Sequence, residues 1–148
     1  MTSPQIPAAG ARPHTAPAAG TTTLEPTMTD SATRRSRRSA RDAGTRAETA
    51  VARYLRDHGF AHAERRARRG RLDEGDIAGI PGVVIEVKDC RQLTLSAWLR
   101  EADVERDHAG AWLGAVWHKR SGRADPGEWY VTMTGAAFAA LLHDADAS

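Results

Sequence analysis

Hydrophobic and polar positions follow the period of a helix in the second quarter of this 148-residue chain. Between residues 33 and 58 the apolar side chains recur every three to four positions, at Ala47, Ala50, Val51, Tyr54 and Leu55. This pattern predicts a helix that begins at about Thr33 or Thr45. Gly59 directly follows the pattern and is typical of a helix end, because glycine adopts the left-handed backbone conformation easily.

The centre of the chain has the pattern of a β-hairpin. Residues 76–80 form a short apolar run, Pro81-Gly82 is a turn signal, and residues 83–87 form a β-branched run that only Glu86 interrupts. In the second strand Val83, Ile85 and Val87 share the face toward the core. Side chains alternate along a strand, so Glu86 and Lys88 share the opposite face and are neighbours.

The loop of this hairpin decides where Asp76 points. A two-residue loop at residues 81–82 turns Asp76 away from Glu86. A three-residue loop over residues 80–82, with Gly82 in the left-handed conformation, pairs Asp76 directly with Glu86 at about 4.5–5.5 Å. We expect an odd-numbered loop or a bulge, because two facing carboxylates at this distance can chelate an ion.

The rest of the pattern predicts further strands and helices. Residues 60–69 are arginine-rich and ambiguous, with an edge strand as one interpretation. Ser96 is a candidate N-cap for a helix that runs to about His108 and stops at Gly110. Two strands are predicted over residues 111–118 and 128–133. Thr134 is expected to cap a last helix whose side chains Phe138, Leu141 and Leu142 point toward the core. This order of helix, three strands, helix, strand, then strand and helix, indicates an α/β domain.

Composition sets the boundaries of that domain. Residues 1–32 are rich in Ala, Pro, Thr and Gly and contain few bulky apolar side chains, so we expect a disordered arm before one domain over residues 33–148. No run approaches the roughly 18 to 20 apolar residues of a membrane span, and no secretion signal is evident, which favours a cytoplasmic protein. The single cysteine, Cys90, excludes an internal disulfide.

Charge is distributed unevenly along the chain. Residues 33–71 contain thirteen arginines and four acidic residues, a balance of +9, whereas residues 72–148 contain seven basic and thirteen acidic residues, a balance of −6. A cationic half beside a carboxylate-rich half suits an enzyme that acts on a polyanion, since arginines hold phosphates while carboxylates hold a cation. The alternative is that Arg34, Arg35, Arg37 and Arg38 form only a solvated segment.

The acidic hairpin has the groups that phosphodiester hydrolysis requires. Carboxylate oxygens of Asp76 and Glu86 suit Mg²⁺, for which Mn²⁺ can substitute, and such an ion activates water and neutralises charge on a phosphate. Lys88 would orient the water or stabilise the anionic transition state, because nearby carboxylates keep its amine protonated. The alternative is a buried Glu86-Lys88 pair with Asp76 capping a turn, which gains little stability by itself.

These residues resemble a known signature. Asp76, nine intervening residues and then Glu86-Val87-Lys88 resemble the signature of the PD-(D/E)XK nucleases, with Gly75 in place of the usual proline. Over residues 44–120 the resemblance implies a restriction-endonuclease-like αβββαβ core, a mixed central sheet flanked by helices. It also implies that the catalytic hairpin, residues 75–89, binds the metal through Asp76, Glu86 and the Val87 carbonyl.

Residues 46–60 are similar to the first helix of archaeal-type and phage Holliday junction resolvases. In that family a glutamate of this helix joins the metal site, which corresponds to Glu48. The alternative is a capping box, Thr45-x-x-Glu48, in which the glutamate satisfies a backbone amide. The resemblance implies a homodimeric, magnesium-dependent endodeoxyribonuclease of recombination, DNA repair or phage DNA processing, in a bacterium or a phage-infected cell.

The DNA partner, branched or duplex, is expected to contact the basic helical part over residues 33–71. The candidate phosphate-binding residues are Arg34, Arg35, Arg37, Arg38, Arg65, Arg66, Arg68, Arg69 and Arg71. His118, Lys119 and Arg120 are weaker candidates, since a charged strand end explains them equally well. Two other functions stay open: a nuclease of the same core that acts on ends, flaps or lesions, and a catalytically inactive DNA-binding module.

Overall fold

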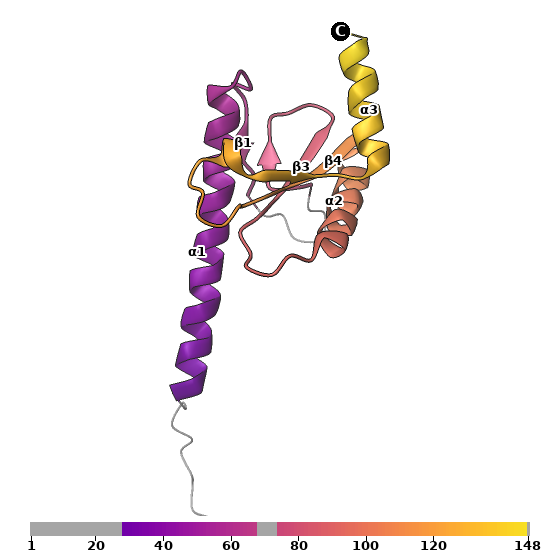
Figure 1. Cartoon of the computed structure of the whole chain (residues 1–148). Coiled ribbons are helices and arrows are strands. Elements are labelled where there is room, and N and C mark those ends of the chain that lie inside the picture. Colours follow the sequence, from indigo (N-terminus) through magenta and orange to yellow (C-terminus); the bar gives the residue numbers. More distant parts are fainter. Residues whose placement is uncertain (1–27, 68–73, 148) are drawn as a thin grey trace, which may run out of the picture.

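Helices and short strands alternate in a mixed α/β domain in the computed structural model, which describes residues 28–67 and 74–147 (Figure 1). The helices and strands follow the order expected from the sequence. The elements are α1 Met28–Asp57, β1 Glu64–Arg65, β2 Ile77–Ala78, β3 Val83–Lys88, α2 Leu95–Ala109, β4 Leu113–His118, the 3-10 turn η1 Pro126–Glu128, β5 Tyr130–Thr132 and α3 Gly135–Asp146. Within those two described ranges, no helix combines the length and apolar character needed to cross a membrane.

A three-stranded mixed sheet, in the order β3-β4-β5, forms the centre of the domain. Strands β3 and β4 are parallel, from the pair Val83↔Leu113 to the pair Lys88↔His118, and β5 is antiparallel to β4. A parallel pair needs a crossover connection, and α2 supplies it here. Both parallel strands therefore end on the same side of the sheet, immediately after Lys88 and His118.

The predicted hairpin ladder between residues 76 and 88 is wrong. Among the described residues β2 pairs with β1 in an antiparallel two-stranded sheet, and no ladder joins β2 to β3. Asp76 still donates its N–H to the Ile85 carbonyl at 3.0 Å, but its side chain, rather than a backbone carbonyl, accepts from the Val87 N–H. Gly79 has φ +84° and lies so near His62 that a Cβ atom would meet the His62 carbonyl oxygen at 1.8 Å. The chain before the turn is thus packed against the β1 segment, while the turn itself keeps the expected left-handed Gly82 (φ +73°).

Helix α1 covers one face of the sheet. Its buried side chains, Ala47, Val51, Ala52 and Leu55, pack with Ile85 and Val87 of β3. The helix begins at Met28, inside the segment 1–32 expected to be disordered, and residues 1–27 of that segment lie outside the described residues. Figure 1 shows the N-terminal half of α1 extending well past the sheet.

Helix α2 covers the opposite face. Its Trp98 and Ala102 pack against Val116 of β4, and Gly114 permits this approach because a Cβ atom there would lie 3.1 Å from the Ala102 carbonyl oxygen. The helix follows Thr94 rather than the predicted N-cap Ser96 and ends at the predicted Gly110, which has φ +60°. With a helix on each face, both sides of β3 are buried, including the side that carries Glu86.

Helix α3 only partly follows its prediction. Thr134 caps it as expected, since the Thr134 hydroxyl accepts a hydrogen bond of 3.1 Å from the Ala137 N–H. The inward orientation predicted for Phe138 and Leu142 is wrong, because they are 50% and 55% exposed, whereas Leu141 is half-buried. The helix lies beyond the end of the sheet (Figure 1), so that Ala137 is the buried residue of this fully described helix.

Candidate active site

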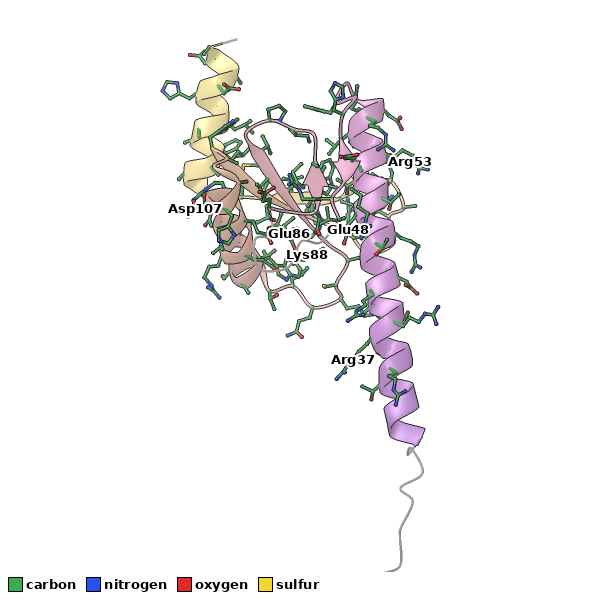
Figure 2. All side chains as sticks on the ribbon, turned by 180° about the vertical axis from the view of Figure 1, so that it is seen from behind. Arg37, Glu48, Arg53, Glu86, Lys88 and Asp107 are labelled. Carbon is green, nitrogen blue, oxygen red and sulfur yellow. The ribbon has the colours of Figure 1, made fainter. Side chains whose placement is uncertain are left out.

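A lysine and two glutamates form an ion-pair network between β3 and α2, buried at Glu86 and half-exposed at Glu101. The Lys88 Nζ donates to Glu86 Oε1 at 2.5 Å and to Glu101 Oε2 at 2.6 Å. Glu86 is 6% exposed, and Lys88 lies on the same face of β3, as the alternation of the strand predicted. Figure 2 shows both labelled side chains inside the domain, between α1 and α2.

Asp76 is held at the free edge of β3, next to Glu86. Its carboxylate Oδ2 accepts a hydrogen bond of 2.8 Å from the Val87 N–H, and its own N–H donates to the Ile85 carbonyl at 3.0 Å. After burial, the negative charge of Glu86 is the largest cause of the raised pKa of Asp76, so the two side chains are near neighbours. The structure therefore brings the two carboxylates together, although two hydrogen bonds rather than a strand ladder achieve it.

The Val87 carbonyl lies on the same edge of β3. In a strand the N–H and C=O of one residue point to the same side, so the Val87 carbonyl follows its N–H toward Asp76. The next carbonyl, that of Lys88, points to the opposite edge and accepts from the Lys119 N–H at 2.9 Å. Asp76 and the Val87 carbonyl thus present hard oxygen atoms at the free edge of β3, next to Glu86, whose own carboxylate clusters with Glu101 and Glu105 of α2.

Glu48 reaches this region from α1. It is 3% exposed, and its charge contributes to the raised pKa of Asp76. Its Oε2 accepts a hydrogen bond of 2.5 Å from Arg65 Nε. The capping-box alternative is wrong, because α1 begins at Met28 and Thr45 lies in the middle of the helix.

The sequence pattern did not identify two acidic residues of α2 that join this cluster, Glu101 and Glu105. Oxygen atoms of Glu86, Glu101 and Glu105 lie within 4.8 Å of one another, and Glu105 is 6% exposed. The available signal was their spacing of four, which places Glu101 and Glu105 on one helix face. That spacing did not show that the face would meet β3, so nothing local distinguished the pair from a solvated surface.

Burial disfavours the ionised forms of Asp76 and Glu86. Burial raises the pKa of Asp76 to about 7, the charges of Glu86 and Glu48 add to it, and the Val87 N–H acts in the opposite direction. Burial also raises the pKa of Glu86 to about 7, opposed by Lys88 and reinforced by Glu105 and Glu101. A hard divalent cation fits this donor set, because it would stabilise the ionised forms that burial disfavours.

Lys88 is a permanent cation at neutral pH. Burial lowers its pKa, but the hydrogen bonds and charges of Glu101 and Glu86 together outweigh burial and raise the pKa above its ordinary value. An amine in this state does not accept a proton from water. Its chemistry is therefore that of a positioned positive charge and hydrogen-bond donor.

We expect Mg²⁺ to raise the melting temperature more at pH 8 than at pH 5. The raised pKa values mean that the ionised carboxylates weaken the fold: stability is highest below the unfolded-state pKa, near 4, and falls as the pH rises through about 7. Mg²⁺ stabilises the ionised state and competes with protons at lower pH. Thermal melts with 10 mM MgCl₂ or with NaCl of equal ionic strength test this expectation, and equal magnesium effects at both pH values contradict it.

The candidate DNA-binding arginines fall into different environments. Arg34, Arg37 and Arg38 are exposed on the projecting half of α1. Arg65 is engaged with Glu48, and Arg66 forms an ion pair with Glu74. The side chain of Arg35 and all of residues 68–73, with Arg68, Arg69 and Arg71, lie outside the described residues. His118 is 4% exposed and bonds Thr132 Oγ1 at 2.8 Å, so burial keeps it from a phosphate.

Comparisons with known proteins gave no match: no family model, curated protein or solved structure is significantly similar to this chain. An assignment of function therefore depends on the site itself. That site consists of the carboxylates of Asp76 and Glu86, the Val87 carbonyl and Lys88, with Glu48 and the α2 glutamates around them.

Proposed function

We propose that this protein is a metal-dependent endonuclease that hydrolyses DNA phosphodiester bonds on a restriction-endonuclease-like core. The observation that carries the proposal is the pair of buried carboxylates, Asp76 and Glu86, with pKa values of about 7, beside a lysine on the same strand. Buried carboxylates that repel one another weaken a fold, so their presence favours a functional role. The resemblance of Asp76 and Glu86-Val87-Lys88 to the PD-(D/E)XK signature supports the nuclease class.

The residues that would hold Mg²⁺ are Asp76, Glu86 and the Val87 carbonyl, with Glu48 as a further ligand. The bound ion would activate water and neutralise charge on the scissile phosphate. Lys88 would direct its ammonium toward the phosphate oxygens, where negative charge develops in the transition state. Glu101 holds Lys88 from the α2 side, so the ammonium is oriented before the substrate arrives.

The face of α1 that carries Glu48 also carries arginines toward its N-terminus. Arg34 and Arg41 precede Glu48 by fourteen and seven residues, and seven residues make almost two whole helical turns. Arg34, Arg41 and Glu48 therefore share one side of the helix, and Arg37 lies close to the same line. Along the helix axis Arg41 is about 10 Å and Arg34 about 20 Å from Glu48. Figure 2 shows Arg37 on the side of α1 toward the domain and Arg53 on the outer side. This arrangement supports phosphate contacts that lead toward the site.

Replacing Arg34, Arg37 and Arg41 together by Ala is expected to weaken DNA binding and its salt dependence. Each lost phosphate contact lowers the slope of log K against log salt by about 0.9, so the triple variant should lose about 2 to 3 from the slope. Fluorescence anisotropy with a duplex at several salt concentrations measures it. The matched control is Arg46→Ala/Arg53→Ala on the outer face of α1, and an equal loss of slope there contradicts a specific path for DNA.

Among nucleases of this class, a homodimeric Holliday junction resolvase is the particular function that we propose. The similarity of residues 46–60 to resolvase helices supports it, and the exposed apolar side chains Val131, Phe138 and Leu142 offer a surface for a second copy. Sedimentation velocity on the full chain tests the dimer, and a monomer at micromolar concentration counts against it.

Cleavage assays separate the candidate functions. A four-way junction, a linear duplex and a single strand are incubated with the protein, with and without Mg²⁺. Paired nicks in the junction alone support a resolvase, whereas degradation from ends or cleavage at a flap supports a different nuclease of the same core. Tight binding without any cut, unchanged in Lys88→Ala, supports an inactive binding module and overturns the proposal.

A further inference from the structure

An open groove begins where the candidate active site ends. Its volume is about 1220 Å³, and it lies between α1 and the loops that follow β3 and β4. One wall consists of small residues of α1, and the other of loop residues together with Tyr130; its lining includes Ser36, Ser39, Ala40, Ala43, Asp89, Arg91, Leu93, Lys119 and Arg120. Figure 1 shows the projecting half of α1 beside the loop after β3.

The position of the groove relates it to the site. Strands β3 and β4 are parallel and both end at its floor, with Asp89 directly after Lys88 and Lys119 directly after His118. In parallel sheets ligands bind beyond the carboxyl ends of the strands. A chain lying in this groove would thus run past the end of β3, where Lys88 is located.

One wall of the groove carries positive charge, and the other wall consists of small side chains. Among its described lining residues, Arg91, Lys119 and Arg120 face one acid, Asp89, which forms an ion pair with Lys119 at 3.1 Å. The α1 wall is made of serine and alanine side chains, which are too short to fill the space and leave room for a chain. Positive charge along an open groove suits a phosphodiester backbone.

Tyr130 adds an aromatic surface to this groove. Tyr130 is 50% exposed although it lies at the start of β5, and its ring centroid is 5.5 Å from both the Arg120 guanidinium and the His118 ring. An aromatic ring beside arginines is the arrangement on which unpaired bases stack in single-stranded nucleic acids. In a duplex the bases already stack on each other, so their faces are not available to Tyr130.

We infer that the groove binds a single-stranded segment of DNA, with one base stacked on Tyr130 and phosphates held by Arg91, Lys119 and Arg120. The inference rests on the proposed nuclease function in one respect, because it names the substrate class: DNA with an unpaired segment next to the phosphate that is cut. The binding itself requires neither Mg²⁺ nor cleavage.

The test measures binding in EDTA with a fluorescein-labelled dT₁₂ strand and with a duplex of equal length. Tyr130→Thr, which keeps a β-branched residue in β5, should lower single-strand affinity about tenfold and leave duplex affinity unchanged, whereas Tyr130→Phe keeps wild-type affinity. Phe60→Thr, an exposed aromatic residue elsewhere, serves as the matched control. Equal affinity of wild type and Tyr130→Thr for dT₁₂, or an equal loss for the duplex, overturns the inference.

A second measurement does not depend on that variant's folding. A strand containing 2-aminopurine should lose fluorescence on binding to the wild-type protein, because the base stacks on Tyr130, and Arg91→Ser/Arg120→Ser should weaken this binding with a smaller salt slope. Absence of quenching in the bound wild-type complex also overturns the inference. If single-strand binding follows these expectations but no substrate is cut with Mg²⁺, the proposed nuclease function fails while the groove assignment stands.

Discussion

The variant Asp76→Asn is expected to lose DNA cleavage about 10³-fold and to melt at a higher temperature than the wild type at pH 8. Asparagine has the same shape, and its amide oxygen can accept the Val87 N–H bond that Asp76 Oδ2 now accepts. It removes the negative charge that burial and Glu86 make unfavourable. The gain in unfolding free energy should be on the order of 2 kcal/mol, which corresponds to several degrees.

The pH dependence of this gain identifies its cause. Because the Asp76 pKa is about 7 in the folded protein and near 4 when unfolded, the gain is full above pH 7 and disappears as the pH falls toward 4. The control is Asp107→Asn, an aspartate whose side chain is 71% exposed on α2. If Asp76→Asn cuts DNA normally and melts at a lower temperature, Asp76 is a structural residue and the proposed site is incorrect.

The second large effect is expected for Lys88→Met, which keeps most of the side-chain volume and removes the charge. Cleavage should fall by about 10² to 10³, as for the loss of a positioned group that stabilises transition-state charge. Unlike the Asp76 variant, this one should be less stable by about 3 kcal/mol at pH 8, because Glu86 loses its buried cation. The loss of stability should be smaller at pH 5, where Glu86 is protonated. Urea unfolding at both pH values and a cleavage assay measure the two effects.

A double variant separates stability from catalysis at Lys88. Glu101→Gln removes the second carboxylate that the ammonium contacts, so Lys88→Met/Glu101→Gln should recover part of the lost stability and none of the activity. The exposed pair Arg123–Glu128 provides the control, since Arg123→Met should change the unfolding free energy by no more than about 0.5 kcal/mol. Recovery of cleavage together with stability would show that Lys88 only supports the fold.

Local patterns in the sequence were sufficient for the parts of the site that lie on one element. The alternation of residues 83–88 placed Glu86 and Lys88 on one face, and the same alternation occurs in β3. Thr134, Gly59 and Gly110 marked helix ends that the structure contains. These features depend on backbone geometry over a few residues, which side-chain type controls directly.

Features that depend on contact between two elements, such as strand pairing and helix burial, could not be predicted from local patterns. The partner of β2 depends on the close packing of Gly79 against His62, and a single strand has no signal for its neighbour. The exposed Phe138 and Leu142 follow an apolar pattern that indicates a buried face, but it does not show whether this chain covers that face. Hydrophobic spacing reports a preference for burial and does not identify what provides it.

The sequence by itself determined the chemistry that is present: two acids and a lysine in a β-branched segment, a glutamate on an amphipathic helix and a strongly basic N-terminal half. Only the tertiary structure decided which of these groups meet. It placed Asp76 against the Val87 N–H, engaged Glu48 with Arg65, and added Glu101 and Glu105 to the network of Glu86 and Lys88. The physical reason is that pKa shifts and ion pairs arise from burial and from distances between residues far apart in the chain, which exist only after the helices have closed over both faces of the sheet.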